Sequence, residues 1–133
     1  MKVGAAIYSL LVNDSAVSAI VGTRIYPELA EEGASAPYVV YSVVSNTPSD
    51  TKDGTPIDEA QCEIFSVAST YEQCNKLADL VRAALDRKSV TVNDASAGDI
   101  TVQSIQYTNE ITEVSADRKT YIAVQDYTFR IKR

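Results

Sequence analysis

One amphipathic segment in the second half of the chain restricts its fold more than any other feature. From Tyr71 onward, apolar residues recur every three or four positions and polar residues fall opposite them, which is typical of a helix with one buried face. The predicted buried face comprises Tyr71, Cys74, Leu77, Ala78, Val81 and Leu85. Ser69 and Glu72 predict a capping box, in which the serine hydroxyl accepts a hydrogen bond from the backbone of Glu72. The helix is predicted to end near Arg87, and it needs an apolar surface to cover.

The segments on both sides of this helix are rich in Val, Ile, Tyr and Thr, which favour strands. The predicted strands cover residues 38–45, 59–68, 100–107 and 120–131. The last strand is apolar on both faces near its start, which predicts a central position in a sheet. These strands supply the surface that the amphipathic helix requires.

The chain begins with two short helical patterns. Residues 3–12 carry one apolar stripe, and a second helix is predicted between a cap at Asp14 or Ser15 and a terminating Gly22. Pro27 and Pro37 then bracket an elbow that leads into the first long strand. With 133 residues, the chain is long enough for one core, so we expect a single domain over residues 1–133. The order of segments predicts an α+β fold: a mostly antiparallel sheet packed against one long helix and a short N-terminal helical pair.

The charge balance argues against a nucleic-acid-binding protein. Twelve basic and 18 acidic residues give a net charge of −6, and the basic residues are scattered. Apolar runs fall short of the roughly 20 residues that span a membrane. The weakly signal-like start is better interpreted as an amphipathic helix, which predicts a cytoplasmic protein without a membrane partner. In that compartment Cys62 and Cys74 are expected to be reduced and packed as small apolar side chains.

Residues that carry catalysis are sparse. The chain has no histidine, which excludes Ser-His-Asp and Cys-His arrangements and histidine metal ligands. Ser49 and Lys52 match an S-x-x-K pattern, but this pattern lies in a polar loop and its partner motifs are missing. We therefore expect neither an enzyme nor a cofactor.

Two acidic groups are candidate metal sites. The spacing of the first does not match a calcium loop, and a solvated charge run explains it better; the group comprises Asp50, Asp53, Asp58 and Glu59. The second is interpreted as a solvated acidic loop; it comprises Glu28, Glu31 and Glu32. We expect no bound metal.

Three segments are the candidate partner contacts. The first, residues 46–56, is polar and longer than an ordinary hairpin loop, so it is either a tolerated insertion or a binding loop. The others are predicted turns at residues 93–99 and 110–118. The candidate contact residues are Asn46, Ser49, Asp50, Thr51, Lys52, Asp53, Gly54, Asp94, Asp99, Glu113 and Arg118. Eight tyrosines against two phenylalanines also suit a protein in which two or three tyrosines face a partner.

Three short motifs carry a family resemblance. Residues 21–27 read VGTRIYP, residues 37–41 read PYVVY, and the strand-to-helix junction at residues 68–71 reads ASTY. Together, over nearly the whole chain, they resemble the tail completion, or tail terminator, proteins of long-tailed bacteriophages and prophages. Many members have a shorter spacer with Pro-Gln between the two prolines. Residues 28–36 depart from that pattern with three glutamates.

The resemblance implies an α+β protein that assembles as a six-fold ring in the virion tail, after synthesis in the host bacterial cytoplasm. Its partners would be further copies of itself, the major tail tube protein and the head connector or stopper protein. It would cap the tail tube, end tube polymerisation and join the tail to the head, while DNA passes through without specific binding. The alternative is a small cytoplasmic binding or regulatory domain of prophage origin with no virion role, which should have a pocket with convergent polar groups.

Overall fold

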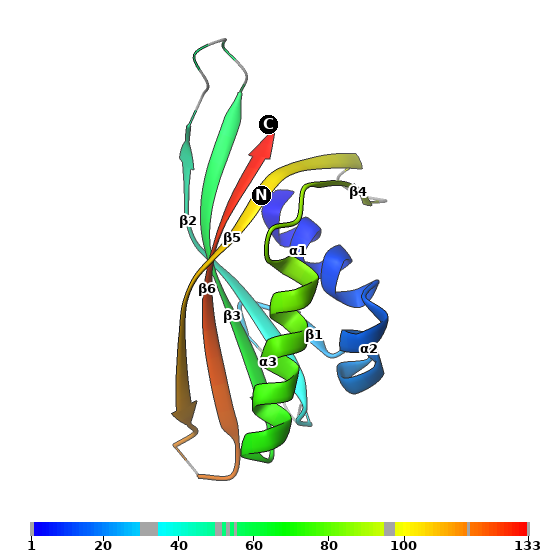
Figure 1. The fold of residues 1–133 in the computed structure, drawn as a ribbon, viewed down its shortest axis with the longest axis vertical. Helices are drawn as coiled ribbons and strands as arrows, with labels where there is room; N and C mark the ends of the chain where they lie inside the picture. The colour runs from blue at the N-terminus through cyan, green and yellow to red at the C-terminus, as the bar shows by residue number, and fades with distance from the viewer. Residues whose placement is uncertain are drawn as a thin grey trace.

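The computed structural model describes residues 2–29, 35–49, 52, 54, 56–94, 98–116 and 118–132. The helices are α1 (Lys2–Val12), α2 (Ser15–Val21) and α3 (Tyr71–Leu85). The strands are β1 (Ile25–Pro27), β2 (Tyr38–Pro48), β3 (Ile57–Ala68), β4 (Val90–Asp94), β5 (Gly98–Val114) and β6 (Tyr121–Lys132). They form one six-stranded sheet in the order β1-β2-β3-β6-β5-β4, and all three helices lie on the same side of it (Figure 1). The predicted α+β fold is confirmed.

β6 lies inside the sheet and pairs along its whole length. Its register with β3 runs from Ile57↔Lys132 to Ala68↔Tyr121, and β5 pairs with its other edge. This confirms the position predicted from its two apolar faces. β1 runs parallel to β2, whereas the other neighbouring strands are antiparallel.

The N-terminal helices begin and end close to the predicted residues. Asp14 caps α2 by accepting hydrogen bonds from the backbone N–H groups of Ala16 and Val17, at 3.1 and 3.0 Å. Gly22 ends α2 with a φ of 60°, in the left-handed region that favours glycine. Among the described residues no single helix is long and apolar enough to cross a membrane; α1 and α2 reach that threshold only as a pair, bent by 85°.

The elbow between the helices and the sheet is held by one arginine. Arg24 donates from Nε to the carbonyl of Pro37 at 3.0 Å and from Nη2 to the carbonyl of Ile20 at 3.2 Å. It therefore ties the end of α2 to the residue that opens β2. Between them β1 adds a short parallel strand.

The start of α3 differs from the predicted capping box. The N-cap is Thr70, whose hydroxyl accepts from the backbone N–H of Gln73 at 3.2 Å, and Ser69 precedes the helix. The helix also ends at Leu85, two residues earlier than predicted, because Arg87 turns to a φ of 62° and donates its N–H to the carbonyl of Ile105. The predicted buried face is confirmed except at Tyr71, which is 56% exposed and packs edge-on against Tyr121.

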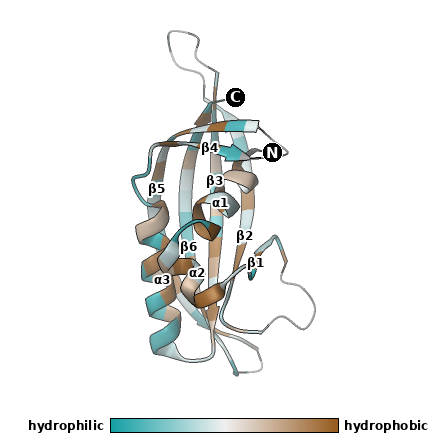
Figure 2. Ribbon diagram, turned by 90° about the vertical axis from the view of Figure 1, so that its right-hand side faces the viewer, coloured by the Kyte–Doolittle hydropathy of each residue, from teal (hydrophilic) through white to brown (hydrophobic). Residues whose placement is uncertain are grey.

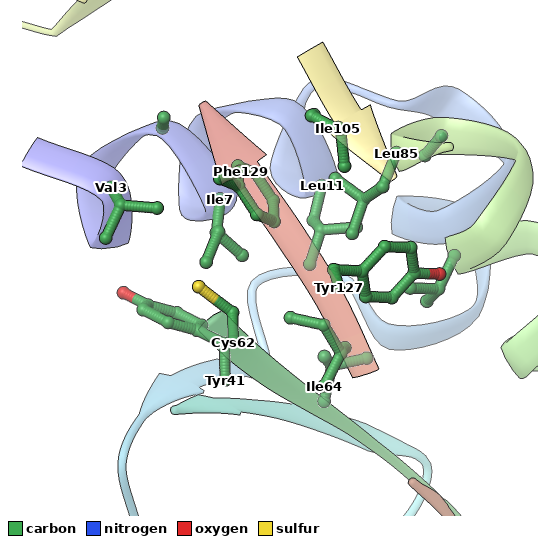
Figure 3. Close-up of a cluster of buried hydrophobic side chains, with 14 of the residues drawn as sticks. Val3, Ile7, Leu11, Tyr41, Cys62, Ile64, Leu85, Ile105, Tyr127 and Phe129 are labelled. Carbon is green, nitrogen blue, oxygen red and sulfur yellow. The ribbon is translucent and has the colours of Figure 1, made fainter. Parts of the chain in front are cut away.

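The core lies between the helices and the sheet. Figure 3 shows Ile7 and Leu11 of α1, Leu85 of α3 and the rings of Tyr127 and Phe129 of β6 in one cluster. All five side chains are fully buried. Figure 2 shows the matching pattern along α3, where hydrophobic and hydrophilic residues alternate. Both cysteines are free and buried, as expected.

A buried glutamine joins α3 to the sheet. Gln125 of β6 donates from Nε2 to the carbonyl of Ala78 at 3.0 Å and to Glu110 at 2.7 Å, while its Oε1 accepts from the Tyr127 hydroxyl at 3.0 Å. Hydrogen bonding of this kind offsets the desolvation of a buried amide. The network fixes how α3 sits over β6.

Two strands run further than predicted, and one strand was not predicted. β2 continues through Pro48 and β5 continues to Val114, while β4 includes Asn93 and Asp94 of the predicted turn. The added residues are mostly polar and exposed, so hydropathy does not mark them. Backbone pairing with the neighbouring strand makes them strands, as in Thr47↔Glu59 of β2 and β3.

The cap of α3 provides a test. Thr70→Ala should lower the free energy of unfolding by about 1 kcal/mol, because it leaves the Gln73 N–H without its acceptor. Ser69→Ala is the matched control and should change stability by less than about 0.5 kcal/mol. Urea denaturation of both variants checks this, and a larger loss in Ser69→Ala would restore the predicted capping box.

Candidate interaction surface

The first candidate contact segment forms a projecting β-hairpin. We call the β2–β3 extension formed by residues 44–49 and 56–59 the arm; it reaches past the helices at one end of the sheet (Figure 1). Asn46 lies on the paired part of β2 and Ser49 directly follows it, so both belong to the stem of the hairpin and not to a loop. Lys52 and Gly54 are exposed beyond it, with Gly54 at a φ of 85°. Asp50, Thr51 and Asp53 lie outside the described residues.

Side chains from the central strand support the arm. Arg130 of β6 forms an ion pair with Glu59 at 3.0 Å and donates to the Ser49 hydroxyl at 3.4 Å. Within the arm, Asn46 donates to Asp58 at 3.3 Å, and the Ser49 N–H donates to the carbonyl of Ile57 at 2.7 Å. These contacts make the arm an extension of the sheet.

The other two candidate segments lie at opposite ends of the molecule. Asp94 and Asp99 flank the β4–β5 connection, where the Asp99 carboxylate accepts from Asn93 at 2.7 Å. Glu113 lies on β5 opposite Ile122, so it is a strand residue and not part of the predicted turn. Arg118 lies in the turn that follows, at a φ of 58°. The arm lies at one end of the sheet and the β5–β6 turn at the other, and the ends of β4 and β5 that carry Asp94 and Asp99 lie to the side, nearer the arm (Figure 1).

A further surface, missed by the sequence analysis, is the helix-free face of the sheet. The register places Val40, Phe65 and Val124 in one row across β2, β3 and β6, with Tyr38, Val67 and Ile122 in the next row on the same face. Together with Leu29, which is 81% exposed, the residues of these rows other than Val124 line a shallow depression of about 240 Å³. The signal is present in the sequence, because both faces of residues 121–124 are apolar. This pattern predicts a central strand, and it also indicates an apolar patch on the face without helices.

Acidic groups surround this apolar patch. Glu63 and Asp126 pair across β3 and β6 just beyond it, and Glu113 lies beside Ile122. Glu28 borders the depression and accepts from the Ser42 hydroxyl at 2.8 Å and the Val43 N–H at 3.2 Å. An apolar centre with a charged rim is the usual composition of a protein-binding surface.

The titratable groups of the core are held neutral. Burial, with a smaller contribution from the negative charge of Glu28, raises the pKa of the Cys62 thiol from 9.0 to about 12. Burial likewise raises the pKa of Cys74 and Tyr127. A thiol that stays protonated at neutral pH is a poor nucleophile and a poor metal ligand. Among the described residues no three cysteine or carboxylate side chains are grouped so as to hold a metal ion.

Comparison with known proteins identifies the family. Residues 5–132 match the family model described as Tail completion protein gp17. The chain thus belongs to the tail completion protein family and is a structural component of a virion tail.

A solved structure shares the fold. One chain of the virion of a native gene transfer agent (GTA) particle aligns with a TM-score of 0.73 at 17% identity, covering 97% of this chain and 93% of that chain. No curated protein sequence matches significantly. At this identity, the structural similarity supports the fold.

The Cys62 thiol predicts a pH dependence of stability. Because its folded pKa lies above the ordinary value, its stabilising contribution is complete below about pH 9 and is lost as the pH rises toward 12. Urea denaturation should show little effect of this thiol between pH 7 and pH 9. Between pH 9 and pH 10.5 the thiol should lower the free energy of unfolding by about 1 kcal/mol per pH unit. The Cys62→Ala variant should have a shallower slope, whatever its absolute stability. Equal slopes would contradict the assignment.

Proposed function

We propose that this protein caps the virion tail tube as a six-fold ring, ends tube polymerisation and joins the tail to the head connector. Membership of the tail completion family over residues 5–132 carries this proposal. Its partners would be further copies of itself, the major tail tube protein and the connector or stopper protein. The mechanism is assembly by surface contacts, with no bond made or broken.

The arrangement of surfaces suits such a joint. The arm at one end and the β5–β6 turn at the other give the molecule two distinct ends, as a piece between a tube and a connector requires (Figure 1). A ring with six-fold symmetry also needs heterologous contacts, in which one surface meets a different surface on the neighbour. The two sides of the sheet, with β1 and β2 on one side and β4 on the other, are different surfaces and meet that condition.

The net charge suits a conduit for DNA. A charge of −6 on each copy would be multiplied in a ring, and like charges repel phosphate groups at close range. DNA would then pass without binding specifically. This argument concerns the net charge of the protein and assigns no particular face to the channel.

Assembly tests the proposal directly. Light scattering over a concentration series, with negative-stain imaging, should show a discrete six-fold ring in solution or, where the tube acts as template, at the ends of tail tubes purified from the parent phage. Either result supports the proposal. A protein that stays monomeric and does not bind tube ends contradicts it and favours a regulatory domain.

The tip of the arm provides a second test. Deleting residues 50–54 should change the stability of the monomer by less than about 1 kcal/mol, because it only shortens a connection between paired strands. The same deletion should abolish binding to tube ends, measured by co-sedimentation with purified tubes. The control Lys76→Ala alters an exposed residue of α3 and should bind normally. Normal binding by the deletion variant would show that the tip is a tolerated insertion.

A further inference from the structure

A groove runs beside an edge strand at the arm end of the molecule. It has a volume of about 520 Å³ and lies between the C-terminal half of α1 and β4. Leu10 and Asn13 border it on one side, and consecutive β4 residues from Val90 to Asn93 border the other. Lys88, in the segment between α3 and β4, also lines it. A groove lined by four successive residues of a strand runs along that strand.

β4 is unpaired along its outer edge. It pairs with β5 on one side, from Val90↔Val102 to Asp94↔Gly98, and among the described residues no strand pairs with its other side. In an edge strand, half of the backbone N–H and C=O groups point outward and can accept another strand. The groove therefore combines an open hydrogen-bonding edge with the partly apolar flank of α1.

The arm carries the second open edge of the sheet. β1 pairs with β2 only from Val39 to Tyr41. Beyond that point, the Glu28 carboxylate accepts a hydrogen bond from the Val43 N–H. From Val44 to Pro48 the outer edge of β2 faces no other strand of the described chain. The Ser49 N–H points toward β3, where it donates to the carbonyl of Ile57. Because backbone groups alternate between the two edges of a strand, those of Asn46 and Pro48 point away from β3, toward the open edge.

The two edges match in length and character. The free edge of the arm spans residues 44–48, and β4 has the same length, five residues. Residues 44–48 carry no charge, and Val44 is 59% exposed. The groove offers apolar Leu10 and Val90 and polar Asn13 and Thr91. It also has one charge of each sign, from Asp14 and Lys88. An uncharged strand with an exposed valine suits this mixed surface.

The two edges cannot meet within one molecule. β2 and β4 lie toward opposite sides of one sheet, with β3, β6 and β5 between them. Each copy therefore offers one donor edge and one acceptor edge, which is the arrangement that a heterologous, rotationally closed ring requires. We propose that the arm of one copy lies in the groove of the next and pairs residues 44–48 with β4 by strand addition. This inference rests on the proposed ring and names its subunit contact.

Cross-linking between different copies tests the contact. Asn46→Cys on one copy and Thr91→Cys on another should be joined by a short bifunctional thiol reagent, which tolerates a shift of one residue in register. The two native cysteines are buried and hence unreactive. Mixing the two single variants should give a covalent dimer, and the double variant should give a ladder of species up to the closed ring. The control pair Asn46→Cys with Lys76→Cys should give none.

A charged substitution tests the same contact without a cross-linking reagent. Val44→Lys should leave the fold intact, because this side chain is mostly exposed, yet it should reduce ring formation at least tenfold by placing a charge in the groove. Ala83→Lys adds the same charge on the exposed side of α3 and should assemble normally. Both are measured by light scattering and by binding to tube ends.

The possible outcomes separate this contact from the proposed function. A ring or tube-end binding by the wild-type protein, without the mixed cross-link, overturns the arm-in-groove contact and leaves the capping function standing. Cross-linking of Asn46→Cys to itself also overturns it, because it shows arm-to-arm pairing. Absence of both ring and tube binding overturns the function and the contact together. The mixed cross-link with loss of assembly in Val44→Lys supports both.

Discussion

The burial of Tyr127 and Phe129 between the helices and the sheet is the interaction on which the rest of the structure depends. Both rings are fully buried, and they stand on the strand that pairs with β3 on one side and β5 on the other. A shift of β6 by one residue would turn these rings to the helix-free face, so their burial sets the register of β6 with both β3 and β5. Burying an aromatic side chain contributes about 1.5–3 kcal/mol, which makes such a shift costly.

That register also determines where the contact surfaces lie. In the register set by the core, Arg130 stands opposite Glu59 and reaches Ser49, so the same strand that is anchored by Phe129 supports the arm. At its other end, β6 places Ile122 and Val124 beside Phe65 and Val67 on the helix-free face. One strand thus links the core, the arm and the apolar patch.

Local patterns in the sequence predict most of the helices and strands. The remaining features, such as the polar strand ends and the groove beside β4, depend on contacts between segments that are distant in the sequence. The stripe along α3 and the two apolar faces of β6 identified a helix and an inner strand. Ser69 and Thr70 are adjacent, and the hydroxyl of either residue can serve as the N-cap of α3. Which of them does so depends on the path of the backbone between the end of β3 and the start of the helix. The polar ends of β2 and β5 are strands because a neighbour pairs with them. The groove beside β4 brings residues near position 10 together with residues near position 90, which no local pattern indicates.

Open edges at both sides of a sheet allow subunits to assemble, but they also allow uncontrolled strand pairing between copies. Strand addition that does not close by rotation produces filaments, so a ring-forming protein must restrict how its edges pair. Four features restrict pairing here. β4 is only five residues long, and β2 has a bulge between Val43 and Ser45. Glu28 accepts the hydrogen bond from the Val43 N–H, and Pro48 has no N–H to donate. Each of these limits indiscriminate pairing while leaving a short edge at residues 44–48. A contact limited to so few residues is weak on its own, so its stability would come from the simultaneous closure of all the contacts in a ring, or from the tube beneath it.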